Sequence, residues 1–276
     1  MISGKDLIFE LVNNSFAKCA EMRALDRTEF FHYTNLESFA KILSTSSLLF
    51  NRIDHLNDRN ETENFYNTEV ANLVFVSSFS IVNESIPLWH MYTKDNLGLL
   101  LHFSFEEIPA KKFLFDYDRC VTAKNSKYES KQIKLFGGTE FSSPDLSEWC
   151  VEIRQTDIRY VDNKQKIEMN CSEANMKYNV TEMGSSKNIA WNYEIETRFI
   201  AMLRTTADNI EVPDFDYLLV PIKLDEIEKL TIYFNPWMSS EMKKCVELLC
   251  NEYIDSSYFH KIEFKDSQFT NKITRK

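Results

Sequence analysis

The chain has 276 residues, of which 43% are hydrophobic, so it can bury a sizeable core as one large domain or two small ones. Its 42 acidic and 32 basic residues give a net charge of −10, which repels nucleic acid at long range and leaves only a local basic groove for such a partner. No apolar run approaches the roughly 20 residues that cross a bilayer, and we expect no membrane role.

Six cysteines are scattered without C-x-x-C spacing: Cys19, Cys120, Cys150, Cys171, Cys245 and Cys250. The N-terminal residues lack the basic-then-apolar order of a signal peptide. We therefore expect a cytoplasmic protein with reduced thiols. The chain has five glycines and neither a P-loop nor a G-x-G-x-x-G pattern, which argues against a phosphate-cradling loop.

The first part of the chain predicts short strands and helices in irregular order. Apolar residues at helical spacing indicate an amphipathic helix over residues 5–24. A strand over 30–33 ends at Thr34, which opens a capping box, T-x-x-E, before a second helix that reaches Leu43. The remaining predicted elements are strands at 48–50, 73–80 and 98–105 and short helices near 62–71 and 87–92.

Residues 106–190 are more polar and less periodic, with a predicted helix near 163–179. We interpret them as an insertion within one domain of residues 1–276. Strands return at 194–203, 217–222, 229–234 and 259–264, and one helix begins at Ser239 or Ser240. Because strands and helices do not alternate strictly, the pattern favours an α+β fold with a mainly antiparallel or mixed sheet.

Residues 191–200 read WNYEIETRFI and form the most informative short segment. The period of a strand places Glu194, Glu196 and Arg198 on one face. The opposite face then enters the core with Tyr193, Ile195, Thr197 and Phe199. By itself the segment allows two interpretations, a solvated ladder of charges on an edge strand or the floor of a site.

Two further segments place polar groups at strand ends. His32 lies at a strand-to-helix junction, where it either meets a ligand or has a structural role. Residues 77–80, S-S-F-S, end an apolar strand, and their hydroxyls either line a cleft or cap the next turn.

A polar loop and an aromatic pair complete the candidates. The loop 57–61, N-D-R-N-E, lies near Arg52 and His55 and could order itself over a ligand or supply oxygen ligands to a metal. Its spacing matches no metal-site signature. Trp89 and Tyr92 lie on one face of a short helix and belong to the core or to a cleft wall.

Taken in order, these segments resemble a bacterial domain family of unknown function. Its pattern is H-Y-T, N-D-x-x-E, a strand ending in serines, W-x-x-Y followed by G, W-x-x-E-x-E-x-R, and a late strand–turn–helix. The matching segments are 32–34, 57–61, 78–80, 89–98 and 191–198. The late turn of the family usually carries Gly-Pro, where this chain has Asn235-Pro236.

That family is remotely similar to DarT-type ADP-ribosyltransferases, whose fold is a split, mainly antiparallel sheet around an NAD cleft with flanking helices. The resemblance implies this fold, with NAD as the substrate and no metal. Carried over by position, His32 and Thr34 contact NAD, and Ser78 and Ser80 support the nicotinamide pocket. The resemblance further implies stacking on nicotinamide by Tyr33, Trp89 or Tyr92, and pyrophosphate contacts from Arg52 or Arg59.

The same resemblance makes Glu196 the catalytic residue, with Glu194 preceding it. Cleavage of the nicotinamide–ribose bond develops positive charge on the sugar, as glycoside cleavage does, and a nearby carboxylate stabilises that charge. The implied activity is ADP-ribosylation of a macromolecule, either nucleic acid or protein. The implied role is that of a toxin or antiphage effector, with an antitoxin protein as a partner.

Two other interpretations remain at this point. One is a non-catalytic module that keeps the cleft for a nucleotide or a protein partner. The other is a metal-dependent hydrolase or nuclease that uses Asp58, Glu61, Glu194 and a histidine. The Lys-rich stretch 124–134 is either a nucleic-acid groove or a solvated face.

Overall fold

The computed structural model describes residues 27–58, 61, 71–93, 96–107, 114–127, 129–136, 149–162, 183–205 and 212–274. Its strands are β1 (Glu29–Asn35), β2 (Ser47–Arg52), β3 (Val74–Ser80), β4 (Gly98–Ser104), β5 (Cys120–Lys124), β6 (Ser130–Phe136), β7 (Cys150–Asp157), β8 (Arg159–Val161), β9 (Ser186–Asn188), β10 (Glu196–Arg204), β11 (Tyr217–Pro221), β12 (Lys229–Phe234) and β13 (Ile262–Asp266). The α-helices are α2 (Leu36–Thr45), α4 (Ile86–Tyr92) and α7 (Ser240–Tyr253). The 3₁₀ helices are η1 (Ile53–His55), η5 (Ile189–Glu194) and η6 (Ser256–Lys261).

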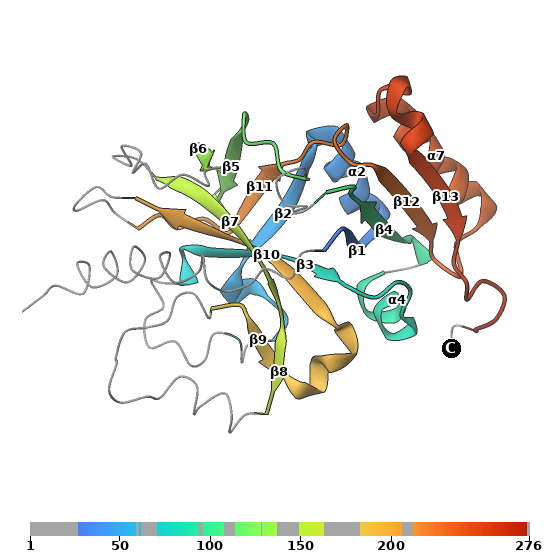
Figure 1. The fold of residues 1–276 in the computed structure, drawn as a ribbon, viewed down its shortest axis with the longest axis horizontal. Helices are drawn as coiled ribbons and strands as arrows, with labels where there is room; N and C mark the ends of the chain where they lie inside the picture. The colour runs from blue at the N-terminus through green and yellow to red at the C-terminus, as the bar shows by residue number, and fades with distance from the viewer. Residues whose placement is uncertain are drawn as a thin grey trace, which may run out of the picture.

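Eleven strands form one sheet in the order β10-β7-β6-β5-β11-β2-β3-β1-β4-β12-β13. Strand β10 also pairs with β3, so the seven strands from β10 to β3 close into a barrel, and the last four extend from it beside α7 (Figure 1). Neighbours are antiparallel except for β6–β7 and β12–β13. The mainly antiparallel α+β fold is confirmed, whereas a closed barrel replaces the predicted split sheet because β10 is hydrogen-bonded along both edges.

Aromatic side chains fill the inside of the barrel, with Phe199 of β10 at the centre. The Phe199 ring centroid lies 5.2 Å from those of Phe30 and Phe79 and 5.1 Å from that of Phe115. All four rings are buried, and Phe79 and Phe115 meet Phe199 edge to face. Each such pair adds about 0.5–1.5 kcal/mol beyond the area it buries. This packing fixes β1, β3 and β10, the strands that carry most of the sequence motifs.

Most of the elements predicted from periodicity are present. Strands β1 to β4 match the predicted strands, α4 has Pro87 in its first turn, and α7 begins after Ser239, whose side chain accepts a hydrogen bond from the Met242 amide. The predicted capping role of Thr34 is wrong. Thr34 continues β1 opposite Leu99, and Asn35 caps α2 by accepting from the Ser38 amide at 2.8 Å.

Packing around Thr93 explains two further parts of the sequence pattern. A Cβ added at Gly98 would lie 1.8 Å from the Cβ of Thr93, so only glycine fits there. The Thr93 hydroxyl accepts from the side-chain amide of Asn235 at 2.7 Å, and the Asn235 side chain accepts from the Trp237 amide at 2.9 Å. Gly98 and Asn235 therefore join the end of α4 to the turn after β12.

Strands β5, β6 and β7 come from the stretch 106–190 and are members of the barrel, and β7 pairs with β10 along its length. The assignment of residues 1–276 to one domain with an insertion remains a prediction. The helices predicted at 5–24 and 163–179 fall on residues outside the described ranges, as does the helix predicted near 62–71 except for Ala71, which is helical. Four cysteines of the described part are free thiols: Cys120, Cys150, Cys245 and Cys250. None of the described helices combines the length and apolarity needed to cross a membrane.

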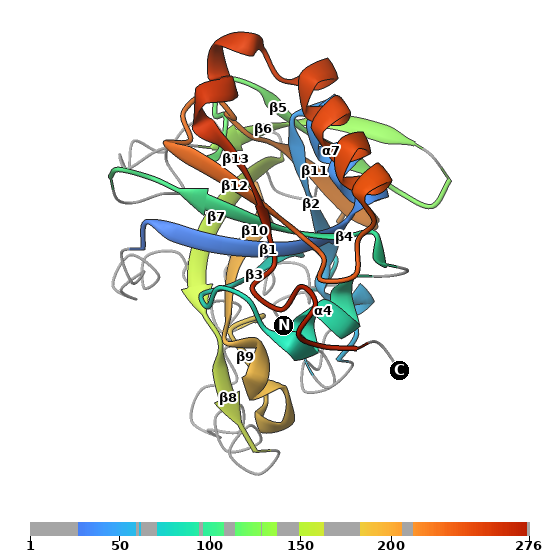
Figure 2. The ribbon, with the colours of Figure 1, turned by 90° about the vertical axis from the view of Figure 1, so that its right-hand side faces the viewer.

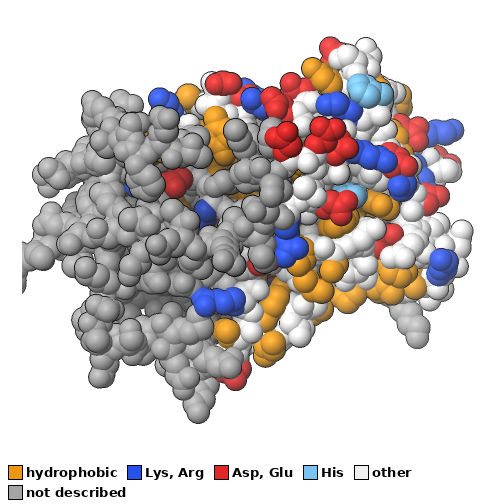
Figure 3. Space-filling model, viewed as in Figure 1, with side chains coloured by type: hydrophobic (Ala, Val, Ile, Leu, Met, Phe, Trp, Pro, Cys, Tyr) orange, Lys and Arg blue, Asp and Glu red, His pale blue; other side chains and the backbone are white. Residues whose placement is uncertain are grey.

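The four-stranded extension lies on one side of the barrel, with β1 and β4 running side by side in front of β3 in Figure 2. On the face shown in Figure 3, charged side chains of both signs cover the region of α7 and β13, and hydrophobic side chains gather over α4 and η5. The exposed large hydrophobic residues of α4, η5 and their flanks are Ile86, Met91, Tyr92, Ile189 and Ile195. The Tyr193 hydroxyl donates to the Met91 sulfur at 2.9 Å, which joins the two elements.

Candidate functional site

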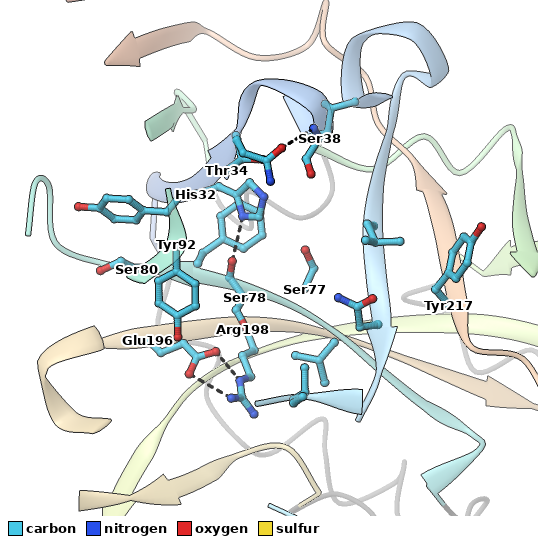
Figure 4. Close-up of a pocket in the computed structure, with 18 of the residues that line it drawn as sticks. His32, Thr34, Ser38, Ser77, Ser78, Ser80, Tyr92, Glu196, Arg198 and Tyr217 are labelled. Carbon is cyan, nitrogen blue, oxygen red and sulfur yellow. Dashed lines mark hydrogen bonds and ion pairs between the residues drawn. The ribbon is translucent and has the colours of Figure 1, made fainter. Parts of the chain in front are cut away.

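A cavity of about 930 Å³ lies where β1 and β2 diverge along β3 (Figure 4). On one edge of β3, Ser80 pairs with Phe31 of β1 and Val76 pairs with Asn51 of β2. Among the described strands, neither β1 nor β2 pairs with residues 77–79 between these points. The fork therefore leaves polar groups of β3 facing the cavity instead of a neighbouring strand.

His32 of β1 closes one side of the fork. Its Nδ1 lies 3.0 Å from the carbonyl oxygen of Ser78, which can only accept, so Nδ1 carries the proton and Nε2 is left as an acceptor in the neutral ring (Figure 4). Burial lowers the pKa of His32, and the hydrogen bond to Ser78 offsets this only in part. The ring is therefore neutral at pH 7.

Ser77 supplies a hydroxyl at the centre of the fork. The side chain is 3% exposed, lines the cavity, and its Oγ has no hydrogen-bond partner among the described residues (Figure 4). A buried polar atom without a partner costs about 1–3 kcal/mol. A ligand in the cavity would satisfy this hydroxyl.

Arg198 of β10 is fully buried between two carboxylates. Its Nε donates to Glu196 Oε1 at 2.6 Å and its Nη2 to Glu196 Oε2 at 3.0 Å. Its two terminal nitrogens also bind both oxygens of Glu61, and Nη1 donates to the Gly184 carbonyl at 3.1 Å. The guanidinium fork matches a carboxylate geometrically, and a buried bidentate pair of this kind holds both groups in one orientation.

Glu194 forms a second buried pair beside the first. Lys187, 2% exposed, has its Nζ 2.6 Å from Glu194 Oε2 and 3.6 Å from Glu196 Oε2, and lies over the Trp191 ring. The Tyr92 hydroxyl donates to the other oxygen of Glu194 and accepts from Asn57. We name Glu61, Lys187, Glu194, Glu196 and Arg198 the buried cluster. It contains three carboxylates and two cations.

The two glutamates of the sequence motif differ in their pKa shifts. Burial tends to raise the pKa of Glu196, but the charge and hydrogen bonds of Arg198, with Lys187, outweigh it and hold the pKa below the ordinary value. For Glu194 burial prevails over the opposing effects of Lys187 and Tyr92, and the pKa lies above the ordinary value. Of the two glutamates, Glu196 is therefore the one whose ionised form the surroundings favour more.

The predicted strand over residues 191–198 is partly wrong. Residues up to Glu194 form the 3₁₀ helix η5, Ile195 is left-handed with φ 42°, and β10 begins only at Glu196. Tyr193 is half-buried and Ile195 is 41% exposed, so neither enters the core as expected. Glu194 still reaches the same cluster as Glu196 because the turn at Ile195 brings η5 back towards β10.

Eight of the ten residues predicted to form the site line the cavity: His32, Tyr33, Thr34, Ser78, Ser80, Tyr92, Glu194 and Glu196. The other two lie elsewhere. Trp89 is fully buried against Tyr33, with its ring nitrogen donating to Glu84 at 3.2 Å. Arg52 is held by Asp54 at 2.7 Å and by Asp214 at 2.6 Å.

The structure adds lining residues that the sequence analysis did not single out as site residues, among them Lys41, Lys124, Lys187 and Tyr217. A lone lysine within S-S-K-N is typical of an exposed turn, so the sequence carries no signal for the burial of Lys187. The loop that contains Glu61 was expected to order itself over a ligand or to bind a metal, whereas the Glu61 carboxylate binds Arg198. In the described ranges, no group of three or more His, Cys, Asp or Glu side chains is arranged to hold a metal ion.

Comparisons with known proteins give only a weak likeness. No protein-family profile matches the chain, and no curated protein matches it by sequence. A solved structure of Thermus sp. 2.9 DarT in complex with NAD+ is similar at a TM-score of 0.35 and 10% identity, covering 87% of this chain and 96% of that chain. A structure of DarT from the same source in complex with ADP-ribosylated ssDNA is similar at a TM-score of 0.35 and 10% identity, covering 88% of this chain and 98% of that chain. At this TM-score the likeness transfers neither fold nor function.

Proposed function

We propose that the chain is an NAD-dependent ADP-ribosyltransferase that modifies a macromolecule. One observation carries the proposal: four separate segments of the sequence pattern meet at a single cavity, with Glu196 fixed and ionised in its wall. These segments are 32–34, 78–80, Tyr92 and 194–198. The volume of the cavity, about 930 Å³, lies within the range of natural ligand cavities, about 300–1,000 Å³.

The proposed chemistry is breakage of the C1′–N bond between ribose and nicotinamide. Nicotinamide leaves with the bonding electron pair, an acceptor atom attacks C1′, and that acceptor loses a proton. The ionised carboxylate of Glu196 stabilises the positive charge that develops on the ribose in this step. Because Arg198 holds the carboxylate in place, no reorganisation is needed when that charge appears.

The neighbouring polar groups have assigned roles in binding the substrate. The neutral His32 ring offers Nε2 as an acceptor for a ribose hydroxyl, and Ser77 offers an unsatisfied hydroxyl. In this proposal the ring of Tyr92, which lines the cavity and is 36% exposed, covers nicotinamide and so excludes water.

The acceptor in this proposal is nucleic acid or protein, and the biological role is that of a toxin or antiphage effector. The exposed apolar residues on α4 and η5 support a macromolecular acceptor, because the same two elements carry Tyr92 and Glu194 of the cavity. An antitoxin that covers this surface is the corresponding partner.

The ion pair between Arg198 and Glu196 favours a second candidate function, that of a non-catalytic nucleotide-binding module. Both oxygens of Glu196 accept from Arg198, so the positive guanidinium offsets the charge that would stabilise the sugar cation. In this alternative the cavity binds the dinucleotide and does not cleave it.

The test measures nicotinamide release and ADP-ribose transfer with labelled NAD in the presence of cellular RNA, DNA or protein. Transferase activity predicts release by the wild type and a loss of at least about 100-fold in Glu196→Gln, the range seen when one transition-state stabiliser is removed. Glu194→Gln should retain more activity, because the raised pKa makes Glu194 the weaker charge.

Glu152→Gln is the matched control, since Glu152 lies on β7, binds Arg204 and does not line the cavity. It should keep wild-type activity, and thermal unfolding of every variant verifies the fold. Binding of NAD without release by the wild type under all acceptor conditions would support the non-catalytic alternative and reject the transferase.

A further inference from the structure

The part of the cavity farthest along the sheet from the buried cluster is formed by three neighbouring strands, β5, β11 and β2. Their register places Lys124 beside Tyr217 and Tyr217 beside Asn51, and in the next row Leu219 lies beside Leu49. The residues between them are buried in the barrel: Ala123, Leu218 and Phe50. By strand alternation, the first set therefore points away from the core and into the cavity. We name Leu49, Lys124, Tyr217 and Leu219 the open end.

The open end presents an uncovered aromatic and apolar surface. Leu49 is 43% exposed, Tyr217 and Leu219 are half-buried, and all three line the cavity. The Tyr217 hydroxyl makes no hydrogen bond within the described ranges, so no protein contact restricts the ring through that group. A flat aromatic ring flanked by leucines is a surface on which a nucleobase stacks.

Positive charge adjoins this surface. Lys124 lies directly beside Tyr217 and makes no ion pair with the described carboxylates, and Lys41 of α2 reaches the same cavity. Lys41 pairs with Glu37, but both side chains are largely exposed and such a pair holds weakly. The described acidic residues that line the cavity are Glu194 and Glu196, both in the buried cluster. Lys124 of the open end and Lys41 of α2 therefore favour an anion in this part of the cavity.

The open end and the buried cluster share one face of a continuous sheet. The row of Lys124, Tyr217 and Asn51 continues to Val76 of β3, and two residues further along β3, Ser78 lies beside Arg198. From β11 to β10 there are three strand spacings, or about 14 Å along the sheet. An extended dinucleotide can cover that separation, whereas a lone nicotinamide or ribose cannot.

We propose that the open end is a subsite for a nucleoside diphosphate, whose base stacks on Tyr217 beside Leu49 and Leu219 and whose phosphates meet Lys124 and Lys41. Its assignment to the ADP half of NAD rests on the proposed function. The subsite also supplies the pyrophosphate contact expected from Arg52 or Arg59. Arg52 is held by Asp54 and Asp214 and does not line the cavity, and Arg59 lies outside the described residues.

The test measures the binding of ADP by calorimetry, because ADP lacks the ribosyl-nicotinamide that would occupy the buried end. Tyr217→Ala should weaken ADP binding about tenfold or more, the order expected for the loss of one stacking partner. Lys124→Met removes the charge and keeps most of the aliphatic chain, and it should weaken ADP binding by about fivefold and reduce its dependence on salt. Neither variant should change the affinity for nicotinamide mononucleotide by as much.

Two exposed residues outside the cavity serve as matched controls: Tyr253→Ala on α7 and Lys134→Met on β6. Both should bind ADP as the wild type does. Absence of ADP binding, or equal ADP affinity in the wild type, Tyr217→Ala and Lys124→Met, would overturn the subsite.

The two proposals fail separately. If ADP binding depends on Tyr217 and Lys124 but nicotinamide is never released, the subsite stands and the transferase is rejected. If nicotinamide is released and the two variants bind ADP as the wild type does, the transferase stands and the subsite is rejected.

Discussion

The two ends of the cavity differ in where their charged side chains find partners. At the buried cluster, each cation binds a carboxylate of the same molecule, as Arg198 does with Glu61 and Glu196. At the open end, Lys124 makes no ion pair within the described part of the chain, and Leu49 is 43% exposed. The first arrangement is complete without a ligand, whereas the second presents groups that a ligand can use.

Along this one face of the sheet, the residues that determine the stability of the fold differ from those that determine ligand affinity. Removing one partner of a buried ion pair leaves an uncompensated charge in a medium of low polarity, which is strongly destabilising. Removing an exposed lysine or an exposed ring leaves nothing uncompensated. Substitutions at the buried cluster should therefore alter folding, and those at the open end should alter binding alone.

The largest effect is expected from Arg198→Met. The substitution leaves Glu61 and Glu196 buried without their shared cation, and should lower the free energy of unfolding by about 3–5 kcal/mol. Denaturant unfolding measures this loss of free energy. The matched control is Arg204→Met, because Arg204 pairs with Glu152 where both side chains are partly exposed, 18% and 29%. Equal losses in the two variants would contradict the special role of the buried cluster.

A smaller effect with opposite signs is expected when Glu196→Gln and Glu194→Gln are compared across pH. The folded pKa of Glu196 lies below its ordinary 4.5, so its ionisation stabilises the fold above that pH and the contribution is lost as the pH falls through the folded pKa. The folded pKa of Glu194 lies above 4.5, so its contribution is present below that pH and is lost as the pH rises through the folded pKa.

The destabilisation caused by Glu196→Gln should therefore shrink as the pH falls below about 4.5. That caused by Glu194→Gln should grow as the pH falls from the raised folded pKa of Glu194 towards 4.5, and should stay constant below that pH. Each tenfold difference in proton affinity between the folded and the unfolded state is worth about 1.4 kcal/mol of stability, and the sign of the change with pH distinguishes the two variants. Urea unfolding between acidic and neutral pH measures both curves. Parallel curves for the two variants would show that the glutamates share one environment.

The smallest effect compares the same change at the two ends. Tyr92→Phe removes a hydroxyl that donates to Glu194, and should cost about 1 kcal/mol of stability. Tyr217→Phe removes a hydroxyl without a partner in the described ranges and should leave the midpoint of thermal unfolding unchanged. An equal loss of stability in Tyr217→Phe and Tyr92→Phe would contradict the claim that only the hydroxyl at the buried cluster stabilises the fold.

Local patterns in the sequence were sufficient for much of the fold. Strand β3 was predictable because β-branched and aromatic residues run without interruption until the serines, and α7 because Ser239 precedes an apolar helical stripe. The prediction of one strand over residues 191–198 was partly wrong because charged residues alternate there with the period of a strand, although residues 189–194 form a 3₁₀ helix. The left-handed Ile195 that separates Glu194 from β10 has no signal in its residue type, since β-branched residues rarely adopt that conformation.

By itself the sequence determined strands β1, β2, β3 and β11 and eight of the residues that line the cavity, because strand period and turn signals are local properties. The tertiary structure alone decided the closure of the barrel, the exclusion of Trp89 and Arg52, and the burial of Lys187. It also joined Arg198 to Glu61, 137 residues apart in the chain. The physical reason is that a buried charge is tolerated only where distant segments bring it a partner, and no local pattern records which partner that is.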